Sequence, residues 1–144
     1  MKKNGFTLIE LLAVIAIIAI LAIIVVPNVL SSLKSSKQKI FVTSYQTLYK
    51  SVEGYIIKEQ LSNPLTPVNK TFSDICNDGV KLDGYEPEYN YYVRIEDGKI
   101  KNMRINNKDY MIKISDDNIK IEDVSLDDIV EYNEGDSICP ILIM

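Results

Sequence analysis

A run of sixteen consecutive apolar residues, LLAVIAIIAILAIIVV, occupies positions 11–26 of the chain. Within the wider stretch 6–30, only Thr7, Glu10 and Asn28 are distinctly polar. A membrane-spanning helix needs about 20 predominantly apolar residues at about 1.5 Å of rise per residue. The stretch 6–30 is therefore long enough to cross a bilayer as one helix.

A secretory signal peptide is the main alternative, because Lys2 and Lys3 precede the apolar core. Two features argue against it: Glu10 lies inside the apolar stretch, and no small-x-small cleavage site ends the stretch before Pro27. A carboxylate at bilayer depth costs about 2.5–3.5 kcal/mol on insertion scales and usually marks a function. The alternative for Glu10 is an interfacial position near the helix start, which the helix dipole favours.

The segment KKNGFTLIELLAVIAIIAILAIIVVP resembles the N-terminus of type IV prepilins and of the related pseudopilins of secretion and DNA-uptake systems. The matching elements are a short basic leader ending at Gly5, the residues Phe6 to Glu10, and the long apolar helix. The resemblance implies that a membrane aspartyl peptidase removes residues 1–5 at the Gly5–Phe6 bond and methylates the new amine of Phe6. It also implies that Glu10 neutralises the N-terminal amine of a neighbouring subunit during assembly.

These implied roles agree with elementary chemistry. Cleavage creates a cation at the head of an apolar helix, and Glu10 follows Phe6 by four residues, on the same helical face. Its carboxylate can therefore pair with its own amine or with that of a neighbour. Such a pair in a dry core fixes register more than it adds stability. Gly5 lets the backbone approach the peptidase closely, with a simple linker glycine as the alternative.

Pro27 interrupts the apolar stretch and removes one backbone donor, which predicts a helix kink or a locally melted turn. Lysines flank both ends of the stretch, at positions 2 and 3 and again at 34, 37 and 39. The positive-inside rule therefore leaves the orientation open. The resemblance implies that the leader lies in the cytoplasm and the remainder of the chain outside.

The segment 31–62 is predicted to continue the helix with an amphipathic pattern. Its apolar residues recur at spacings of three and four, as one face of a helix requires: Phe41, Tyr45, Leu48, Val52 and Tyr55. Pro64 predicts that the helix ends near Leu61 or Ser62. We interpret the stripe as core packing rather than as a cofactor site.

The remaining residues, 63–144, are predicted to form a globular head with a small antiparallel sheet. Residues 63–88 are rich in Pro, Gly and Asn and predict a loop. Turn signals such as Asp97-Gly98 separate four predicted strands: Tyr89–Ile95, Lys99–Ile105, Tyr110–Ile114 and Ile119–Val124. Residues 125–130 predict a capped helical turn, and the apolar tail 140–144 an edge segment. The predicted class is α+β, a long N-terminal helix packed on about four antiparallel strands.

Charge is unevenly distributed along the chain. Residues 31–62 carry five Lys and two Glu, whereas residues 63–144 carry nine basic and seventeen acidic side chains. Nine of those acids, against one Lys, lie between Asp116 and Asp136. An acidic surface repels phosphates, so we expect no general nucleic-acid binding by the head. A calcium site is the alternative for these acids, but EF-hand spacing is missing, which favours a solvated acidic face.

The chain has two cysteines, Cys76 and Cys139, and no histidine. The lack of histidine argues against the common zinc sites and against Ser-His-Asp catalysis. We therefore expect no catalysis, no metal and no cofactor. Outside the cytoplasm the two cysteines fit one disulfide, with two free buried thiols as the alternative. The resemblance implies a similar link, because many pilins fasten their C-terminal region in this way.

Together these features predict a structural subunit that polymerises through its N-terminal helix into a surface filament for adhesion, motility or aggregation. A pseudopilin of a type II secretion or competence DNA-uptake apparatus is the closest alternative. More distant alternatives are a single-pass anchored binding protein and a secreted enzyme. Expected partners are further copies of the chain, related pilins, the prepilin peptidase and a membrane assembly platform. We expect a single-pass precursor in the cytoplasmic membrane with its head outside, and later an extracellular filament.

Overall fold

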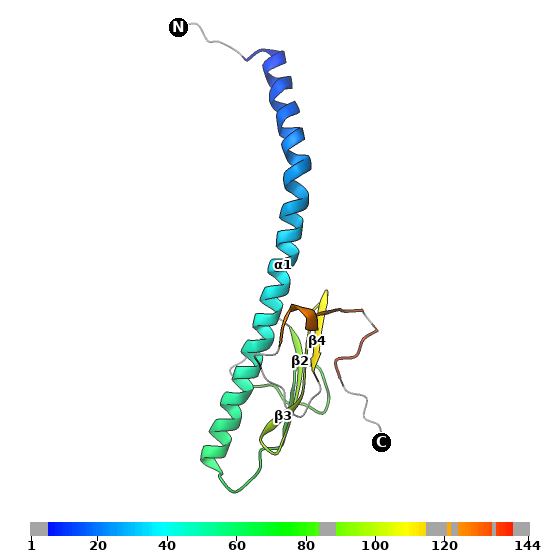
Figure 1. Ribbon diagram of the computed structural model, residues 1–144. Helices are drawn as coiled ribbons and strands as arrows, with labels where there is room; N and C mark the ends of the chain where they lie inside the picture. Colours follow the sequence, from blue (N-terminus) through cyan, green and yellow to red (C-terminus); the bar gives the residue numbers. More distant parts are fainter. Residues whose placement is uncertain (1–5, 84–88, 115–120, 122–123, 134, 140–144) are drawn as a thin grey trace. The chain divides into compact units, whose positions relative to one another are not determined.

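The computed structural model of the chain describes residues 6–83, 89–114, 121, 124–133 and 135–139. Its elements are α1 (Leu8–Ser62), β1 (Lys70–Ser73), β2 (Asn90–Glu96), β3 (Lys99–Asn106), β4 (Tyr110–Ile114), the 3-10 helix η2 (Leu126–Asp128) and β5 (Val130–Glu131) (Figure 1). The chain divides into two compact units, Met1–Lys37 and Gln38–Met144, and α1 contributes to both. The α+β class predicted from the sequence is confirmed, and so is the end of α1 at Ser62.

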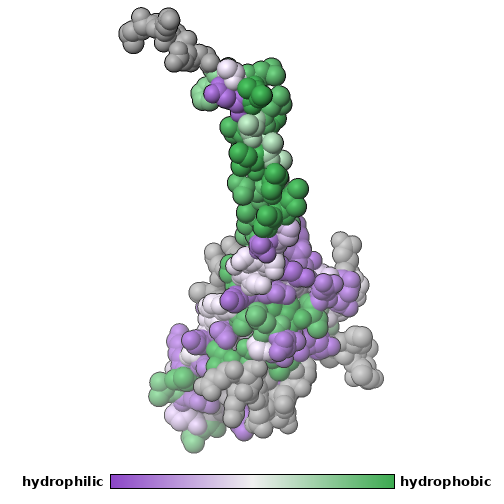
Figure 2. All heavy atoms as spheres, turned by 45° about the horizontal axis from the view of Figure 1, so that its top comes forward, coloured by the Kyte–Doolittle hydropathy of each residue, from purple (hydrophilic) through white to green (hydrophobic). Residues whose placement is uncertain are grey.

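The part of α1 in the first unit is apolar on all sides. The large hydrophobic side chains between Leu8 and Leu33 are 47–77% exposed, and Figure 2 shows them covering the visible face of this segment. The most apolar 18-residue window of α1 has a mean hydropathy of 3.3, enough for a membrane-crossing helix by length and composition. A helix that is apolar all round needs apolar surroundings, and residues 6–37 of this unit provide no other segment to cover it.

The part of α1 in the second unit is amphipathic, and its buried face packs on the sheet. Four residues of the predicted stripe are buried, whereas Tyr55 is only half-buried and Ile56 takes the next buried position. Tyr55 lies at the edge of the core, with its ring against that of Phe72 at 4.8 Å. Its hydroxyl accepts a hydrogen bond from Lys70 Nζ at 3.1 Å. A phenol is best placed where its ring is covered and its hydroxyl has a partner.

The sheet has five antiparallel strands in the order β1-β2-β3-β4-β5, a simple meander. Strands β2, β3 and β4 confirm three predicted strands to within one residue at each end. Asp97 and Gly98 both have positive φ, 51° and 69°, as the tight hairpin turn predicted there requires. The capped turn is also confirmed, because Ser125 and Asp128 form a capping box around η2.

Two details of the sheet differ from the sequence-based prediction. Strand β1 lies inside the predicted loop 63–88, where it pairs along β2 with Phe72 opposite Val93. The predicted strand Ile119–Val124 lies mostly outside the described residues, as does the predicted edge segment 140–144, and Ile121 and Val124 are not in a strand. The described partner of β4 on that side is β5 instead. Both edge strands are four residues or shorter, so side-chain alternation is too brief to predict them.

The two faces of the sheet are covered by different segments of the chain. Successive side chains on a strand point to opposite faces. On β2, Tyr91, Val93 and Ile95 join the main core with the buried face of α1. The alternate residue Tyr92 belongs to a second cluster with Cys76 and Ile138. The segment that ends at Cys139 therefore lies on the face of the sheet opposite α1.

Two links fasten this C-terminal segment to the sheet. A disulfide joins Cys76 to Cys139, whose Cα atoms are 5.7 Å apart. Arg104, a buried residue of β3, donates from Nη1 to the carbonyl oxygen of Ile138 at 3.2 Å. The sequence left two alternatives for the cysteines, a disulfide or two free buried thiols. The structure contains the disulfide.

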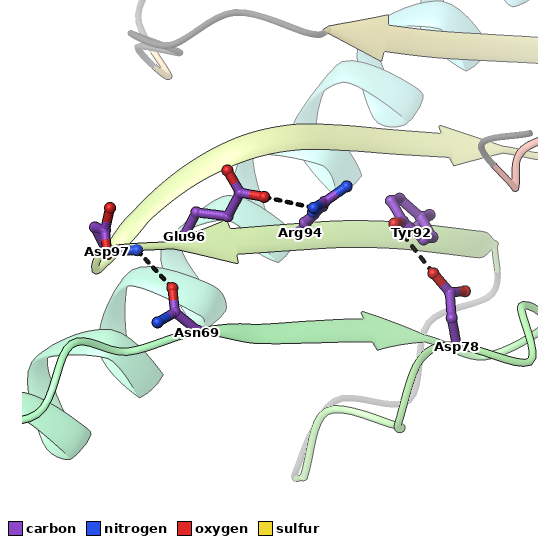
Figure 3. A network of polar contacts seen from close by, with 6 residues as sticks. All are labelled: Asn69, Asp78, Tyr92, Arg94, Glu96 and Asp97. Atoms are coloured by element: carbon purple, nitrogen blue, oxygen red, sulfur yellow. Dashed lines mark hydrogen bonds and ion pairs between the residues drawn. The ribbon is translucent and has the colours of Figure 1, made fainter. Parts of the chain in front are cut away.

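A polar network covers the β1–β2 side of the head (Figure 3). The Tyr92 hydroxyl donates to Asp78 at 3.3 Å, and Asp97 N–H donates to Asn69 Oδ1 at 2.8 Å. Arg94 and Glu96, on the same strand, form an ion pair at 2.6 Å with both side chains partly exposed. Exposed pairs of this kind contribute little to stability, so the Arg94–Glu96 pair adds little to the stability of the fold.

Candidate functional site

The N-terminal end of α1 is closed by a capping box. The backbone N–H and the hydroxyl of Thr7 both donate to Glu10 Oε2 at 2.8 Å. In return, the backbone N–H of Glu10 lies 3.4 Å from Thr7 Oγ1. Thr7 is thus the N-cap residue of a helix that begins at Leu8, and Glu10 is its third helical residue. This reciprocal arrangement satisfies backbone donors that the first turn of a helix otherwise leaves unpaired.

Sequence reasoning missed the role of Thr7. The available signal was the pattern Thr-x-x-Glu immediately before an apolar run, which is a typical helix start. The finding changes the interpretation of Glu10, because its carboxylate has a local partner before any cleavage occurs. Hydrogen bonding lowers the cost of placing a polar group in apolar surroundings.

The nearest cationic side chain along the helix lies far from Glu10. Between Phe6 and Leu33 the sequence has no Lys or Arg, and Lys34 is the first. At about 1.5 Å per residue, Lys34 lies about 36 Å along the helix from Glu10. In a chain cleaved before Phe6, which has lost Lys2 and Lys3, a cationic partner for this carboxylate would come from the new amine of Phe6 or from another molecule.

All three polar side chains of the apolar stretch have intrahelical hydrogen-bond partners. Thr7 and Glu10 bind one another, and Asn28 Nδ2 donates to the carbonyl oxygen of Ile24 at 3.1 Å. Such back-bonding is how a short polar side chain is accommodated in a helix without water. The segment is therefore adapted to apolar surroundings at its polar positions as well.

The other predicted site residues of this segment have different outcomes. Phe6 is 87% exposed beside the capping box, whereas Gly5 lies outside the described residues, so cleavage and methylation stay predictions. Helix α1 continues through Pro27, so the locally melted turn is not present in the structure, and the kink stays a prediction.

The acidic part of the head shows no clustered ligands among the residues that the structure describes. Its described acids, Asp127, Asp128, Glu131 and Asp136, are exposed. Asp128 caps η2, and Asp136 accepts a hydrogen bond from Asn133 N–H at 3.1 Å. Within the described ranges no group of three or more potential metal ligands occurs; the other five acids between positions 116 and 136 lie outside them.

Comparison with known proteins identifies the N-terminal segment. A sequence model described as the prokaryotic N-terminal methylation motif matches residues 1–26. No curated protein and no solved structure gave a significant match. The motif points to a family of structural subunits, implies processing by a prepilin peptidase, and fits a membrane-anchored precursor. Over its first 26 residues, the chain carries the signal motif of type IV pilins and pseudopilins.

Proposed function

We propose that this chain is the structural subunit of a type IV pilus, held in the cytoplasmic membrane as a precursor and then polymerised into an extracellular filament. The observation that carries the proposal is the methylation motif on residues 1–26, continued by a helix whose apolar side chains are all exposed up to Leu33. In this proposal the peptidase cuts the Gly5–Phe6 bond and methylates the amine of Phe6.

Assembly would move this helix from lipid into a bundle of identical helices. Both surroundings are apolar, so the transfer itself provides little hydrophobic driving force. Close packing and polar pairing then decide the register. Glu10 is suited to that role, because it is the only ionisable side chain from Phe6 to Leu33. In the filament the Glu10 carboxylate would bind the amine of a neighbouring Phe6, either in place of its hydrogen bonds to Thr7 or in addition to them.

Mass spectrometry of the mature N-terminus tests the processing step. The expected N-terminal peptide begins at Phe6 and carries one methyl group on its amine. A mature chain that begins at Pro27 or later would instead indicate a cleaved signal peptide and would refute the proposal.

The variant Glu10→Gln tests the assembly step separately from the helix cap. Glutamine also serves as the third residue of a capping box, so the helix start is retained while the negative charge is lost. We expect normal processing at Phe6 but a loss of sheared surface filaments in electron micrographs. The matched control Glu131→Gln removes an exposed charge from the head and should leave filaments intact. Filaments from Glu10→Gln at the unaltered level would contradict the role of the charge, and short assemblies from the unaltered chain would indicate a pseudopilin.

A further inference from the structure

The end of the apolar stretch of α1 carries lysines whose position the proposed membrane orientation does not explain. Lys34, Lys37 and Lys39 follow the stretch, whereas residues 11–52 contain no acidic side chain. An excess of Lys and Arg beside a membrane-spanning helix normally marks its cytoplasmic end. In the proposed precursor this end is the outer one, and cleavage before Phe6 would leave no Lys or Arg at the inner end. The lysines are thus opposite to the rule, so they call for another role.

Spacing along the helix places two of these lysines near the depth of lipid phosphates. The twenty residues from Leu11 to Leu30 cover about 30 Å at about 1.5 Å per residue, the thickness of the hydrocarbon core. Lys34 then lies about 6 Å beyond this core, and Lys37 about 10 Å beyond it. The headgroup layer on each side is about 5–7 Å thick. A lysine side chain is long and flexible enough to bring its ammonium group back to the phosphates.

No contact within the described part of the chain occupies these ammonium groups. Asn28 and Thr43 each donate to the backbone carbonyl four residues earlier. Between these two residues, no side chain of α1 has a hydrogen bond or an ion pair with a described residue. Lys34 and Lys37 are exposed, and so are the four serines beside them, Ser31, Ser32, Ser35 and Ser36. Seven consecutive residues turn almost twice around a helix, so the segment 31–37 presents hydrogen-bond donors on most sides.

Phosphate oxygens accept hydrogen bonds, and their charge makes the bonds from an ammonium group strong. A basic segment next to a membrane is attracted to lipids with a net negative charge. We propose that Lys34 and Lys37 bind the phosphates of anionic phospholipids in the outer leaflet of the cytoplasmic membrane, with the four serines as further donors. This inference rests on the proposed membrane-held precursor. The contact fixes the depth of the precursor in the bilayer and is released when the helix enters the filament.

Electron paramagnetic resonance with spin-labelled lipids tests the inference on the full-length chain in phosphatidylcholine nanodiscs. Lipids next to a membrane-spanning helix give a motionally restricted signal, and its size measures their preference for the protein. Traces of phosphatidylglycerol and of phosphatidylcholine, each labelled near the end of an acyl chain, are compared at low salt. Phosphatidylglycerol should be preferred at least about twofold. The preference should decrease at high salt, because salt screens the attraction between charges.

Variants locate the contact on the helix. Lys34→Gln combined with Lys37→Gln should remove at least about half of the preference. The control Lys50→Gln combined with Lys58→Gln removes the same charge from exposed positions of α1 that lie about 30 Å or more beyond Leu30. It should leave the preference unchanged. An unaltered preference in the first variant, or an equal loss in the control, would refute the assignment to Lys34 and Lys37.

Two further comparisons separate this inference from its alternatives. Replacing chloride by inorganic phosphate at constant ionic strength should leave the lipid preference unchanged. Its loss would indicate a site for free phosphate and would overturn the lipid assignment. Restricted signals of equal size from the two lipids would overturn the inference and leave the membrane-held precursor in place. The absence of a restricted signal from both lipids would contradict the precursor as well.

Discussion

Both units of this chain contain large apolar side chains, but the two units place them in opposite environments. In the unit Met1–Lys37 the large apolar side chains are exposed, whereas in the unit Gln38–Met144 the core residues from Phe41 to Ile138 are at most 9% exposed. Both sets include residues of the same helix, α1. The difference is the pattern: a periodic stripe allows a helix to bury one face against its own sheet, whereas an all-round apolar helix needs lipid or other chains.

This contrast can be tested with one probe, because all nine tyrosines lie between Tyr45 and Tyr132 and the chain has no tryptophan. The near-ultraviolet circular dichroism of tyrosine in the full chain therefore reports on the second unit alone. The predictions below use this signal to separate the two units, in detergent micelles that cover the first.

The largest effect is expected from loss of the disulfide. The bond between Cys76 and Cys139 spans a sequence separation of 63 residues. Closing a loop of this length stabilises a fold by about 4 kcal/mol in the chain-entropy account. The double variant Cys76→Ser, Cys139→Ser should therefore unfold at much lower urea concentration, and added reductant should reproduce the change in the unaltered chain. A change in unfolding free energy below about 1 kcal/mol would show that other contacts hold the C-terminal segment.

Truncation of one apolar side chain should affect the units differently. Leu48 is fully buried between α1 and the sheet, so Leu48→Ala should lower the unfolding free energy of the head by about 3 kcal/mol. Ile18 lies on the same helix but is 58% exposed, so Ile18→Ala should change it by less than about 0.5 kcal/mol. Equal effects in urea titrations would mean that the first unit takes part in the core of the second.

Replacement of Tyr45 should have a smaller effect on the stability of the head, and this effect should depend on pH. Its hydroxyl is buried without a partner, so Tyr45→Phe should stabilise the head by about 1 kcal/mol. Burial, with smaller contributions from Tyr49 and Asp128, raises the pKa of the Tyr45 phenol. The folded head therefore holds this proton more tightly than the unfolded chain does. The part of the folding free energy that depends on this protonated phenol is fully present below about pH 10 and is lost as the pH rises further.

Urea titrations at about pH 8 and about pH 11 check both parts of this prediction. Tyr45→Phe should lose less stability between these two values than the unaltered chain does. If the variant were less stable at both, the hydroxyl of Tyr45 would have a hydrogen-bonding role that its surroundings do not indicate.

The smallest expected effects come from the two capping boxes, one in each unit. Thr7→Val removes the hydroxyl that binds Glu10 and should weaken the first turn of α1 by about 1 kcal/mol, seen as faster amide exchange at residues 8–11. The tyrosine signal should not change. Ser125→Ala removes the cap of η2 and should lower head stability by about 0.5–1 kcal/mol without altering that exchange. Cross-effects between the two variants would show that the two units are energetically coupled.

Local signals in the sequence were sufficient for much of this structure. Hydrophobic periodicity, turn residues and capping residues predicted α1 with its end at Ser62, the strands β2 to β4, the Asp97-Gly98 turn and the capped turn at Ser125. The N-terminal motif is equally local, because its information lies within 26 consecutive residues. Each of these features depends on residues a few positions apart, which is the range over which propensities and caps act.

Only the tertiary structure decided the features that depend on distant residues. Strand β1 exists because Phe72 lies against β2 and Tyr55, and the cysteines are bonded because the chain brings residue 139 back to residue 76. Such contacts are formed at the cost of chain entropy and are stabilised by packing across the core. Whether packing outweighs the entropy cost depends on residues far apart in the sequence, so no periodic pattern within a short segment predicts these contacts.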